Sequence, residues 1–377
     1  MKLLRQSLCC VLCMCLFVLS MPVVVWAEDP VLDATSYILM EASTGEVLLS
    51  QNENESRSIA SITKLMTVLL ILEELQSGNL SLSDMVTASA AASEMGGSQI
   101  YLKEKEVMDV DTMLKSILVA SANDSCVAMA EHICGSEAAF VERMNKRAQE
   151  LGLTATSYKN AHGLDEEGHY SSAKDIAVLA REVLKHDIVR NYTGIWQEKI
   201  RNDTFELTNT NKLIRFYDGA TGLKTGSTTN AGCCLCATAK RNGMELISVT
   251  LNSPTDATRF ADGKKLLDYG FSNYNLKTLA KSDEVITQAN IRYQKPDSVN
   301  LYPKEPLYLL TKKAETKEVT SRIELSAMKA PLSAGSVCGK LIFEADGEIL
   351  KETELICREE VAKQSFFDTL LQFFKVI

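Results

Sequence analysis

The chain has 377 residues, of which 46% are hydrophobic and 24% charged. This composition is typical of folded globular domains and excludes a disordered chain, a collagen-like fibre and a protein with many membrane spans. Forty basic against 49 acidic residues give a net charge of −9. An acidic chain gains no free energy from releasing the counterions of a nucleic acid, so we expect no nucleic-acid partner.

Residues 1–27 have the pattern of an export signal. Lys2 and Arg5 precede an almost uncharged apolar run from Leu8 to Val25, and the run ends at a small residue, Ala27, suited to cleavage. The alternative is an uncleaved signal anchor, because the apolar run approaches the length that spans a bilayer. With either interpretation, the rest of the chain is predicted to lie outside the cytoplasm.

The cysteines are interpreted as small apolar residues. Four of the 11 cysteines lie in the export signal, and the seven that remain cannot all pair with one another. Cys126 and Cys134 lie in a helical pattern that would separate their backbones by ~12 Å, too far for a disulfide. Zinc sites combine cysteines with nearby histidines, and the chain has only four histidines, so we expect neither metal nor cofactor.

Strand and helix patterns alternate over residues 28–274. Ser36–Met40 and Glu46–Ser50 are predicted strands joined by a turn, and helical spacing of apolar residues begins at Ser61 and continues to about Glu74. Further helices are predicted at Asp111–Ala120, Ser125–Ile133, Ala138–Leu151, Ala173–Leu184 and Thr258–Tyr269, and further strands at Cys233–Ala239 and Leu246–Leu251. Because early and late strands enclose the helices, we expect an α+β domain in which both ends contribute to one sheet.

Residues 275–357 are predicted to form a small all-β domain. Short alternating runs are separated there by Pro, Gly and Asp, as is typical of an antiparallel β-structure. The predicted strands are Val285–Ile291, Val299–Tyr302, Leu307–Thr311, Ser321–Ser326, Cys338–Glu344 and Ile349–Ile356.

Residues 358–377 are predicted to form an amphipathic helix. One face is broadly apolar, with Phe366, Phe367, Leu370, Leu371, Phe373, Phe374 and Ile377. The segment is too short to span a bilayer, but an aromatic-rich helix of this kind can lie in the membrane interface. Packing against the β-domain or a partner subunit is the alternative. For an exported protein, the membrane interface is the favoured interpretation.

Three short motifs carry chemistry only as an ordered set. Ser-x-x-Lys occurs at Ser61/Lys64, Ser171/Lys174 and Ser326/Lys329. Ser-x-Asn occurs at Ser50/Asn52, Ser77/Asn79, Ser121/Asn123 and Ser298/Asn300, and Lys-Thr-Gly occurs once, at Lys224-Thr225-Gly226. No Ser-x-Asn lies between the second Ser-x-x-Lys, at Ser171, and the Lys-Thr-Gly at Lys224. The third Ser-x-x-Lys, at Ser326, lies after the Lys-Thr-Gly. Ser61/Lys64 remains, with Ser121/Asn123 in a break between two helical patterns.

The residue types at Ser61 and Lys64 suit nucleophilic catalysis. The start of a helix favours developing negative charge through its free N–H groups, and Lys64 returns to the same face one turn later. A serine hydroxyl needs a neighbouring base, and a lysine becomes one when burial and nearby cations lower its pKa. Taken alone, however, Ser61 would be read as a helix N-cap and Lys64 as a solvated helix charge.

Lys224, Thr225 and Gly226 precede the predicted strand Cys233–Ala239. A cation and a hydroxyl beside an exposed strand edge would suit a peptide that binds alongside as an extra strand, with its carboxylate at Lys224 and Thr225. Gly226 would let the substrate approach the backbone closely. The alternative is an ordinary glycine-rich turn.

The ordered set resembles the penicillin-recognising serine enzymes, and above all the low-molecular-mass penicillin-binding proteins of the D-alanyl-D-alanine carboxypeptidase type. The resemblance extends over about residues 30–272. It is supported by the segments Ala60–Thr67, Ser121–Asp124, His162–Asp165, Tyr170–Asp175 and Asn209–Asn211, and by Ala330–Gly335 in the β-domain. It implies a β-lactamase/transpeptidase-like domain, an antiparallel sheet flanked by helices.

The resemblance also implies roles for single residues. Ser61 would attack the carbonyl between two terminal D-alanines, with Lys64 as base, while Ser121 and Asn123 shuttle a proton and hold the substrate amide. Backbone N–H groups of Ser61 and Ser227 would form the oxyanion hole. The resemblance implies that Lys224 and Thr225, beside Gly226, would bind the terminal carboxylate of the substrate. Arg259 loosely resembles a basic position that some members of the family use near this carboxylate.

We therefore predict a serine D,D-carboxypeptidase that trims peptidoglycan stem peptides at the outer face of the bacterial cytoplasmic membrane and is acylated by β-lactams. A serine β-lactamase is the first alternative, but Asp165–Gly168 lacks the Glu-x-x-Leu-Asn string of the class A type. A non-catalytic wall-binding or penicillin-sensing module is the second, and intact Ser61, Lys64 and Lys224 disfavour it. Endopeptidase or transpeptidase action would use the same residues and stays open.

Overall fold

A computed structural model describes residues 29–291, 298–315 and 317–362. The predicted export signal, residues 1–27, lies outside the described residues, as do residues 363–377 of the helix predicted over 358–377. The helix does not begin at residue 358, because residues 358–362 are not helical and Val361 pairs with Leu332 in a β-bridge. Within the described residues no helix has both the length and the hydrophobicity needed to cross a bilayer.

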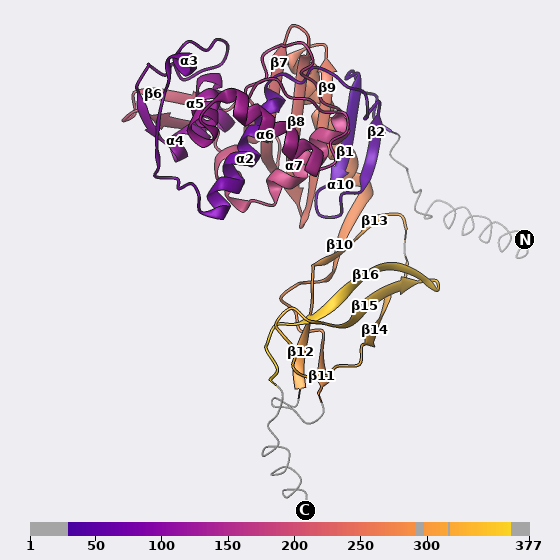
Figure 1. Cartoon of the computed structure of the whole chain (residues 1–377). Helices are drawn as coiled ribbons and strands as arrows, with labels where there is room; N and C mark the ends of the chain where they lie inside the picture. The colour runs from indigo at the N-terminus through magenta and orange to yellow at the C-terminus, as the bar shows by residue number, and fades with distance from the viewer. Residues whose placement is uncertain (1–28, 292–297, 316, 363–377) are drawn as a thin grey trace, which may run out of the picture.

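An antiparallel five-stranded sheet forms the centre of the N-terminal body, in the order β2-β1-β9-β8-β7 (Figure 1). Its strands are β1 (Ser36–Glu41), β2 (Val47–Gln51), β7 (Ala220–Thr228), β8 (Gly232–Arg241) and β9 (Met244–Ser253). Strands from both ends of this region pair with each other, as the sequence predicts. Strand β7 has a neighbour on one side only, so its other edge is open to an extended peptide.

Side chains of the central strands alternate between two apolar cores. In β1, Ile38 and Met40 join one core and Tyr37 and Leu39 the other. This period of two is the geometry of a strand buried on both faces. Two cysteines of β8 follow the same rule, because Cys234 and Cys236 are fully buried in the first core, the one that Ile38 and Met40 join. The interpretation of these two thiols as apolar residues agrees with their positions.

Helices cover both faces of the sheet. The long helices are α2 (Lys64–Ser77), α4 (Val110–Val119), α5 (Asn123–Cys134), α6 (Glu137–Glu150), α7 (Ala173–Leu184) and α10 (Asp256–Asn273). α7 contacts β1 and β9, while α10 contacts β8 and β9 and supplies Leu266 and Leu267 to the second core. Four of these helices begin at a residue whose side-chain oxygen accepts a backbone N–H in the first turn, which fixes where each one starts: Asp109, Ser136, Ser172 and Thr255.

Short elements connect these layers. They are η1 (Ala60–Thr63), β3 (Met85–Thr87), α3 (Ala90–Ser93), β4 (Val107–Asp109), η2 (Asp187–Val189), α8 (Arg190–Thr193), β5 (Gln197–Ile200), β6 (Phe205–Thr208) and α9 (Leu213–Phe216).

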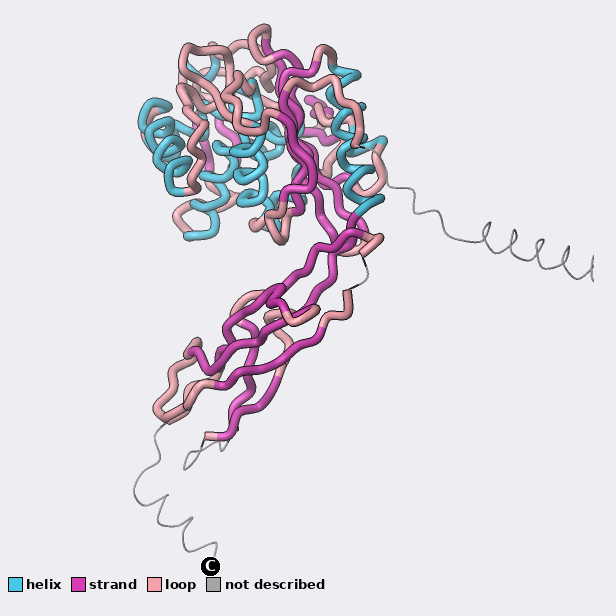
Figure 2. Tube along the Cα trace, turned by 90° about the vertical axis from the view of Figure 1, so that its right-hand side faces the viewer, coloured by secondary structure: helices cyan, strands magenta, loops and turns pink. Residues whose placement is uncertain are grey.

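The C-terminal body is all-β and extends away from the helical body (Figures 1 and 2). A five-stranded sheet has the order β11-β12-β16-β15-β14, and β10 pairs with β13 in a separate ribbon. The strands are β10 (Tyr274–Ala280), β11 (Thr287–Asn290), β12 (Ser298–Pro303), β13 (Leu307–Lys312), β14 (Thr320–Leu325), β15 (Val337–Ala345) and β16 (Glu348–Cys357). The ribbon joins the two bodies, because Leu276 and Leu310 pack against the second core of the N-terminal body.

Two sequence predictions need correction. Lys224, Thr225 and Gly226 precede the predicted strand Cys233–Ala239, which is β8, but they lie within a strand of their own, β7, which the sequence analysis missed. The helix predicted over Thr258–Tyr269 is α10, which is longer at both ends, Asp256–Asn273, so that Arg259 lies in its first turn. The glycines of β7 caused the first error, since Gly222 and Gly226 suggest a turn where the backbone in fact approaches its neighbours closely.

Candidate active site

Ser61 lies on the short 3₁₀ turn η1, which leads directly into α2. The sequence predicts that Ser61 opens the helix, and the structure places it one turn earlier. Its side chain is partly exposed, whereas its neighbours Ile62 and Lys64 are fully buried. The turn therefore leaves the hydroxyl of Ser61 accessible while it buries the neighbouring side chains.

Lys64 is buried and makes three polar contacts. Its Nζ lies 2.9 Å from Ser61 Oγ, 2.6 Å from Asn123 Oδ1 and 2.6 Å from the carbonyl oxygen of His162. These acceptors fix the amine against the serine hydroxyl. The structure thus excludes the reading of Lys64 as a solvated helix charge.

Ser121 lies in the break between α4 and α5 and has a left-handed backbone with φ of 63°, and Asn123 is the first residue of α5. Both side chains are almost fully buried. Asn123 is held on its other side by the loop between α3 and β4, because its Nδ2 donates to Gly96 O at 2.7 Å. The break therefore turns two polar side chains toward Lys64 and Lys224.

Lys224 and Thr225 project from β7 into the same site. Lys224 Nζ donates to Ser121 Oγ at 2.8 Å, and Thr225 Oγ1 donates to Thr210 Oγ1 at 2.7 Å. Gly226 lies against the turn η1, since a Cβ on Gly226 would be 3.0 Å from the amide nitrogen of Ser61. The side chain of Ser227, the next residue on β7, is exposed.

Electrostatics in the site follow from burial. Burial lowers the pKa of Lys64 to about 8, although Asp124 acts in the opposite direction. Burial also lowers the pKa of Lys224, and the charge of Lys64 lowers it further. Burial raises the pKa of the neighbouring Cys126 thiol to about 12, so this cysteine stays protonated and is no competing nucleophile.

Sequence reasoning missed several supporting residues. Asp124 is fully buried and accepts the backbone N–H groups of Ile100 and Leu102, which holds the loop beside Asn123. Arg259 donates to the carbonyl oxygen of Gly226 at 2.9 Å and pairs with Asp256. The segment Ser121–Asp124 could have suggested the first role, whereas the resemblance named Arg259 only as a basic position and did not indicate its contact with the backbone of β7.

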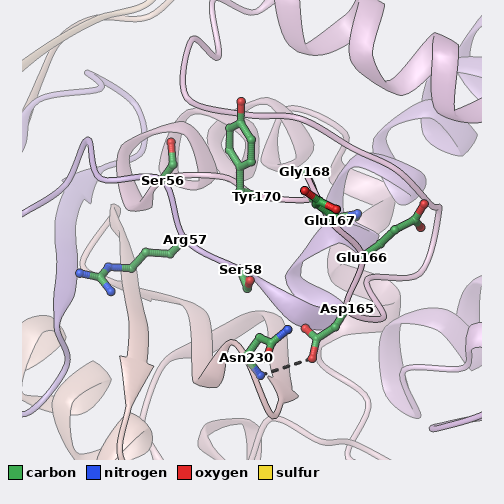
Figure 3. A pocket seen from close by; sticks show the side chains of 10 residues that line it. Ser56, Arg57, Ser58, Asp165, Glu166, Glu167, Gly168, Tyr170 and Asn230 are labelled. Atoms are coloured by element: carbon green, nitrogen blue, oxygen red, sulfur yellow. Dashed lines mark hydrogen bonds between the residues drawn. The ribbon is translucent and has the colours of Figure 1, made fainter.

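An open hollow of about 480 Å³ lies beside the segment that leads into η1 (Figure 3). It is lined by Ser56, Arg57, Ser58, Asp165, Glu166, Glu167, Gly168, His169, Tyr170 and Asn230. Asp165 joins its two walls, since its carboxylate accepts from Thr228 Oγ1 at 2.6 Å and from the backbone of Asn230. Among the residues that the structure describes, no group of three or more His, Cys, Asp or Glu could hold a metal ion.

A serine hydrogen-bonded to a buried lysine, beside a second lysine on an open strand edge, defines a serine hydrolase that uses lysine as its base. Residues 24–255 match the family model described as D-alanyl-D-alanine carboxypeptidase, and residues 274–363 match that of the penicillin-binding protein 5 C-terminal domain. The chain belongs to the D-alanyl-D-alanine carboxypeptidase family, and the predicted activity is confirmed.

Curated relatives and solved structures agree with the family. The chain is 43% identical to D-alanyl-D-alanine carboxypeptidase DacF of Bacillus subtilis, over 90% of this chain and 88% of that protein. It is 31% identical to the solved penicillin binding protein 5 of Haemophilus influenzae, with a TM-score of 0.75 over 89% of this chain and all of that one.

A third similarity concerns β-lactams. Penicillin-binding protein D2 of Listeria monocytogenes, solved in its ampicillin-bound form, is 31% identical, with a TM-score of 0.59 over 64% of this chain and 98% of that one. The protein is therefore a serine-type D-alanyl-D-alanine carboxypeptidase with a penicillin-binding fold, and neither a β-lactamase nor a non-catalytic sensor accounts as well for these matches.

Proposed function

We propose that Ser61 is the nucleophile of this carboxypeptidase and Lys64 its base. Neutral Lys64 takes the proton of Ser61 as Oγ attacks the carbonyl carbon between the two terminal D-alanines. The oxyanion that forms is stabilised by the backbone N–H groups of Ser61 and Ser227. The contact of 2.9 Å between Lys64 Nζ and Ser61 Oγ carries this proposal, because both groups are held in place by buried neighbours.

The remaining residues complete the cycle. Ser121 gives its hydroxyl proton to the amine of the departing D-alanine and regains the proton that Lys64 took from Ser61, so that Lys64 becomes neutral again, and Asn123 holds the substrate amide. The C–N bond breaks and leaves an ester on Ser61, which water then hydrolyses to release the shortened peptide and the free serine. Lys224 and Thr225 bind the terminal carboxylate beside Gly226, and the bound anion favours the charged form of Lys224.

Labelling with benzylpenicillin tests the nucleophile. The drug should add its full mass to the protein, and the modified peptide should contain Ser61. A Ser61→Ala variant should remain unlabelled, whereas Ser326→Ala, which removes the serine of another Ser-x-x-Lys on the exposed β14 side, should label normally. Labelling of folded Ser61→Ala at the normal rate would overturn the assignment.

The proposed substrate is the peptidoglycan stem peptide ending in D-Ala-D-Ala, met outside the cytoplasm. Support comes from the family, from the predicted export signal over residues 1–27, and from the open edge of β7 that can pair with an extended peptide. On this proposal the chain divides into a catalytic domain, 28–274, a β-domain, 275–357, and a C-terminal tail, 358–377, whose proposed helix lies beyond residue 362.

The tail helix is proposed to bind the outer surface of the cytoplasmic membrane. Deletion of residues 359–377 should move the protein from the membrane fraction to the soluble fraction. Leu370→Asp on the apolar face should do the same, whereas Gln372→Asp on the other face should not. Continued sedimentation of the deleted protein with membranes would contradict this proposal.

A further inference from the structure

The residue before the nucleophile has an unusual backbone. Ala60 adopts the left-handed region with φ of 48°, which is uncommon for any residue with a Cβ. Its peptide group leads directly to the N–H of Ser61. A backbone of this kind persists only where its surroundings hold it. The contacts around Ala60 therefore bear on the geometry of Ser61.

The carbonyl of Ala60 is enclosed on two sides. Thr63 Oγ1 donates to Ala60 O at 2.8 Å, closing the turn. Gly163 packs against the same carbonyl, because a Cβ on Gly163 would lie only 2.0 Å from Ala60 O. Thr63 is fully buried, so its hydroxyl has no water to replace these partners. The hydroxyl proton of Thr63 is thus committed to Ala60.

His169 supplies the second hydrogen bond of this hydroxyl. Its Nε2 lies 2.7 Å from Thr63 Oγ1, and its Nδ1 accepts the backbone N–H of Lys159 at 3.2 Å. Since Nδ1 accepts, the ring proton is on Nε2 and is donated to Thr63. A directed chain therefore runs from His169 through Thr63 to the carbonyl of Ala60.

Burial keeps the ring of His169 in its neutral form. Burial lowers the pKa of His169 to about 4, and the charge of Lys159 lowers it further, whereas Glu166 and Asp165 act in the opposite direction. The ring stays neutral at neutral pH. Its edge also packs at a centroid distance of 5.8 Å from Tyr158, so the ring has a packing role as well.

We propose that His169 is a positioning residue for acylation: through Thr63 it fixes the carbonyl of Ala60, and thereby the N–H and the hydroxyl of Ser61. This inference rests on the proposed role of Ser61. His169 itself touches neither Ser61 nor Lys64 in any hydrogen bond of the described structure, so its effect must pass through the turn.

Two substitutions of similar size separate hydrogen bonding from packing. His169→Gln keeps an amide N–H near the position of Nε2, whereas His169→Met fills a similar volume with no donor. The rate constant of acylation by benzylpenicillin should fall about 10- to 100-fold in His169→Met and much less in His169→Gln. The binding step that precedes acylation should change little in either variant.

The chain through Thr63 is tested by a double-mutant cycle. Thr63→Val removes the hydroxyl at nearly constant shape and should slow acylation as His169→Met does, whereas Thr63→Ser should restore it. In the Thr63→Val background, His169→Met should have little further effect, because the two residues act in series.

Equal acylation rates in His169→Met and the wild type, or additive effects in the cycle, would overturn the inference. Equal losses in His169→Gln and His169→Met would also overturn it, since packing alone would then explain them. Failure of the Ser61 assignment is recognised separately, because Ser61→Ala would then still be acylated.

Discussion

Lys64 shows how burial can prepare an ordinary side chain for the base role that we propose. It is fully buried, yet its Nζ has three acceptors within 2.9 Å, so no polar group is left unpaired. Burial lowers its pKa to about 8, and the neutral amine is therefore accessible slightly above neutral pH. A lysine in water, with a pKa of about 10.4, would be charged there.

This pKa predicts how acylation depends on pH. Protonated Lys64 cannot accept the proton of Ser61, so the acylation rate constant should rise about tenfold per pH unit well below pH 8 and level off about one unit above it. Stopped-flow acylation by a β-lactam from pH 5.5 to 9.5 measures this limb.

Lys64→Arg provides the control for that profile. Its guanidinium stays charged over the whole range, so the rate should be low and nearly independent of pH. A wild-type profile without a rising limb near pH 8 would show that Lys64 is not the base.

At the residue scale, the sequence could predict the chemical groups but not all of their supports. The ordered motifs singled out Ser61, Lys64 and Lys224, and the structure brings all three together. The backbone carbonyl of His162 and the link between Thr63 and His169 have no sequence pattern of their own. They depend on where loops distant in sequence meet, which only tertiary structure determines.

At the scale of elements, β7 carries the proposed substrate-binding residues and also packs against η1, the turn that carries Ser61. Its residue Lys224 contacts Ser121, while Gly226 leaves no room for a side chain against Ile59 O and Ser61 N. The strand was missed because glycines are poor strand formers and favour turns. The strands β1 and β9 were predicted well because branched apolar residues continue through them.

Gly226→Ala should push β7 and η1 apart. The added Cβ would lie 2.8 Å from Ile59 O and 3.0 Å from Ser61 N, so β7 or η1 must shift. We expect a loss of acylation of about 100-fold, because such a shift moves the oxyanion donors and the hydroxyl together.

The acylation rate of Gly226→Ala is to be measured with its circular dichroism spectrum, which should remain that of a folded protein. Activity close to the wild type would contradict the close approach of β7 to η1.

At the scale of the whole molecule, only the N-terminal body supplies side chains to the candidate site. Every side chain of the candidate site comes from the N-terminal body, and the C-terminal body contributes contacts through its ribbon and an ion pair between Lys351 and Glu46 at 2.9 Å. Both ion-pair partners are partly exposed, so the pair adds little stability. The all-β character of this body was predictable because alternation is strong there, whereas its attachment through β10 was not.

Removal of the C-terminal body should therefore spare the chemistry. A chain of residues 28–273 should be acylated by benzylpenicillin within about threefold of the full-length rate. It should melt at a lower temperature, because Leu276 and Leu310 no longer cover the second core. Lys351→Ala serves as the control and should change neither quantity appreciably. A fall of more than about tenfold in a folded truncated chain would mean that the β-body shapes the site.

The central claim is that Ser61 carries out the D,D-carboxypeptidase reaction. Its most direct test is the release of D-alanine from a peptide ending in D-Ala-D-Ala, with residues 28–358 of the wild type, Ser61→Ala and Ser326→Ala. We predict release by the wild type and by Ser326→Ala, and none by Ser61→Ala. Release by folded Ser61→Ala at the wild-type rate would contradict the account.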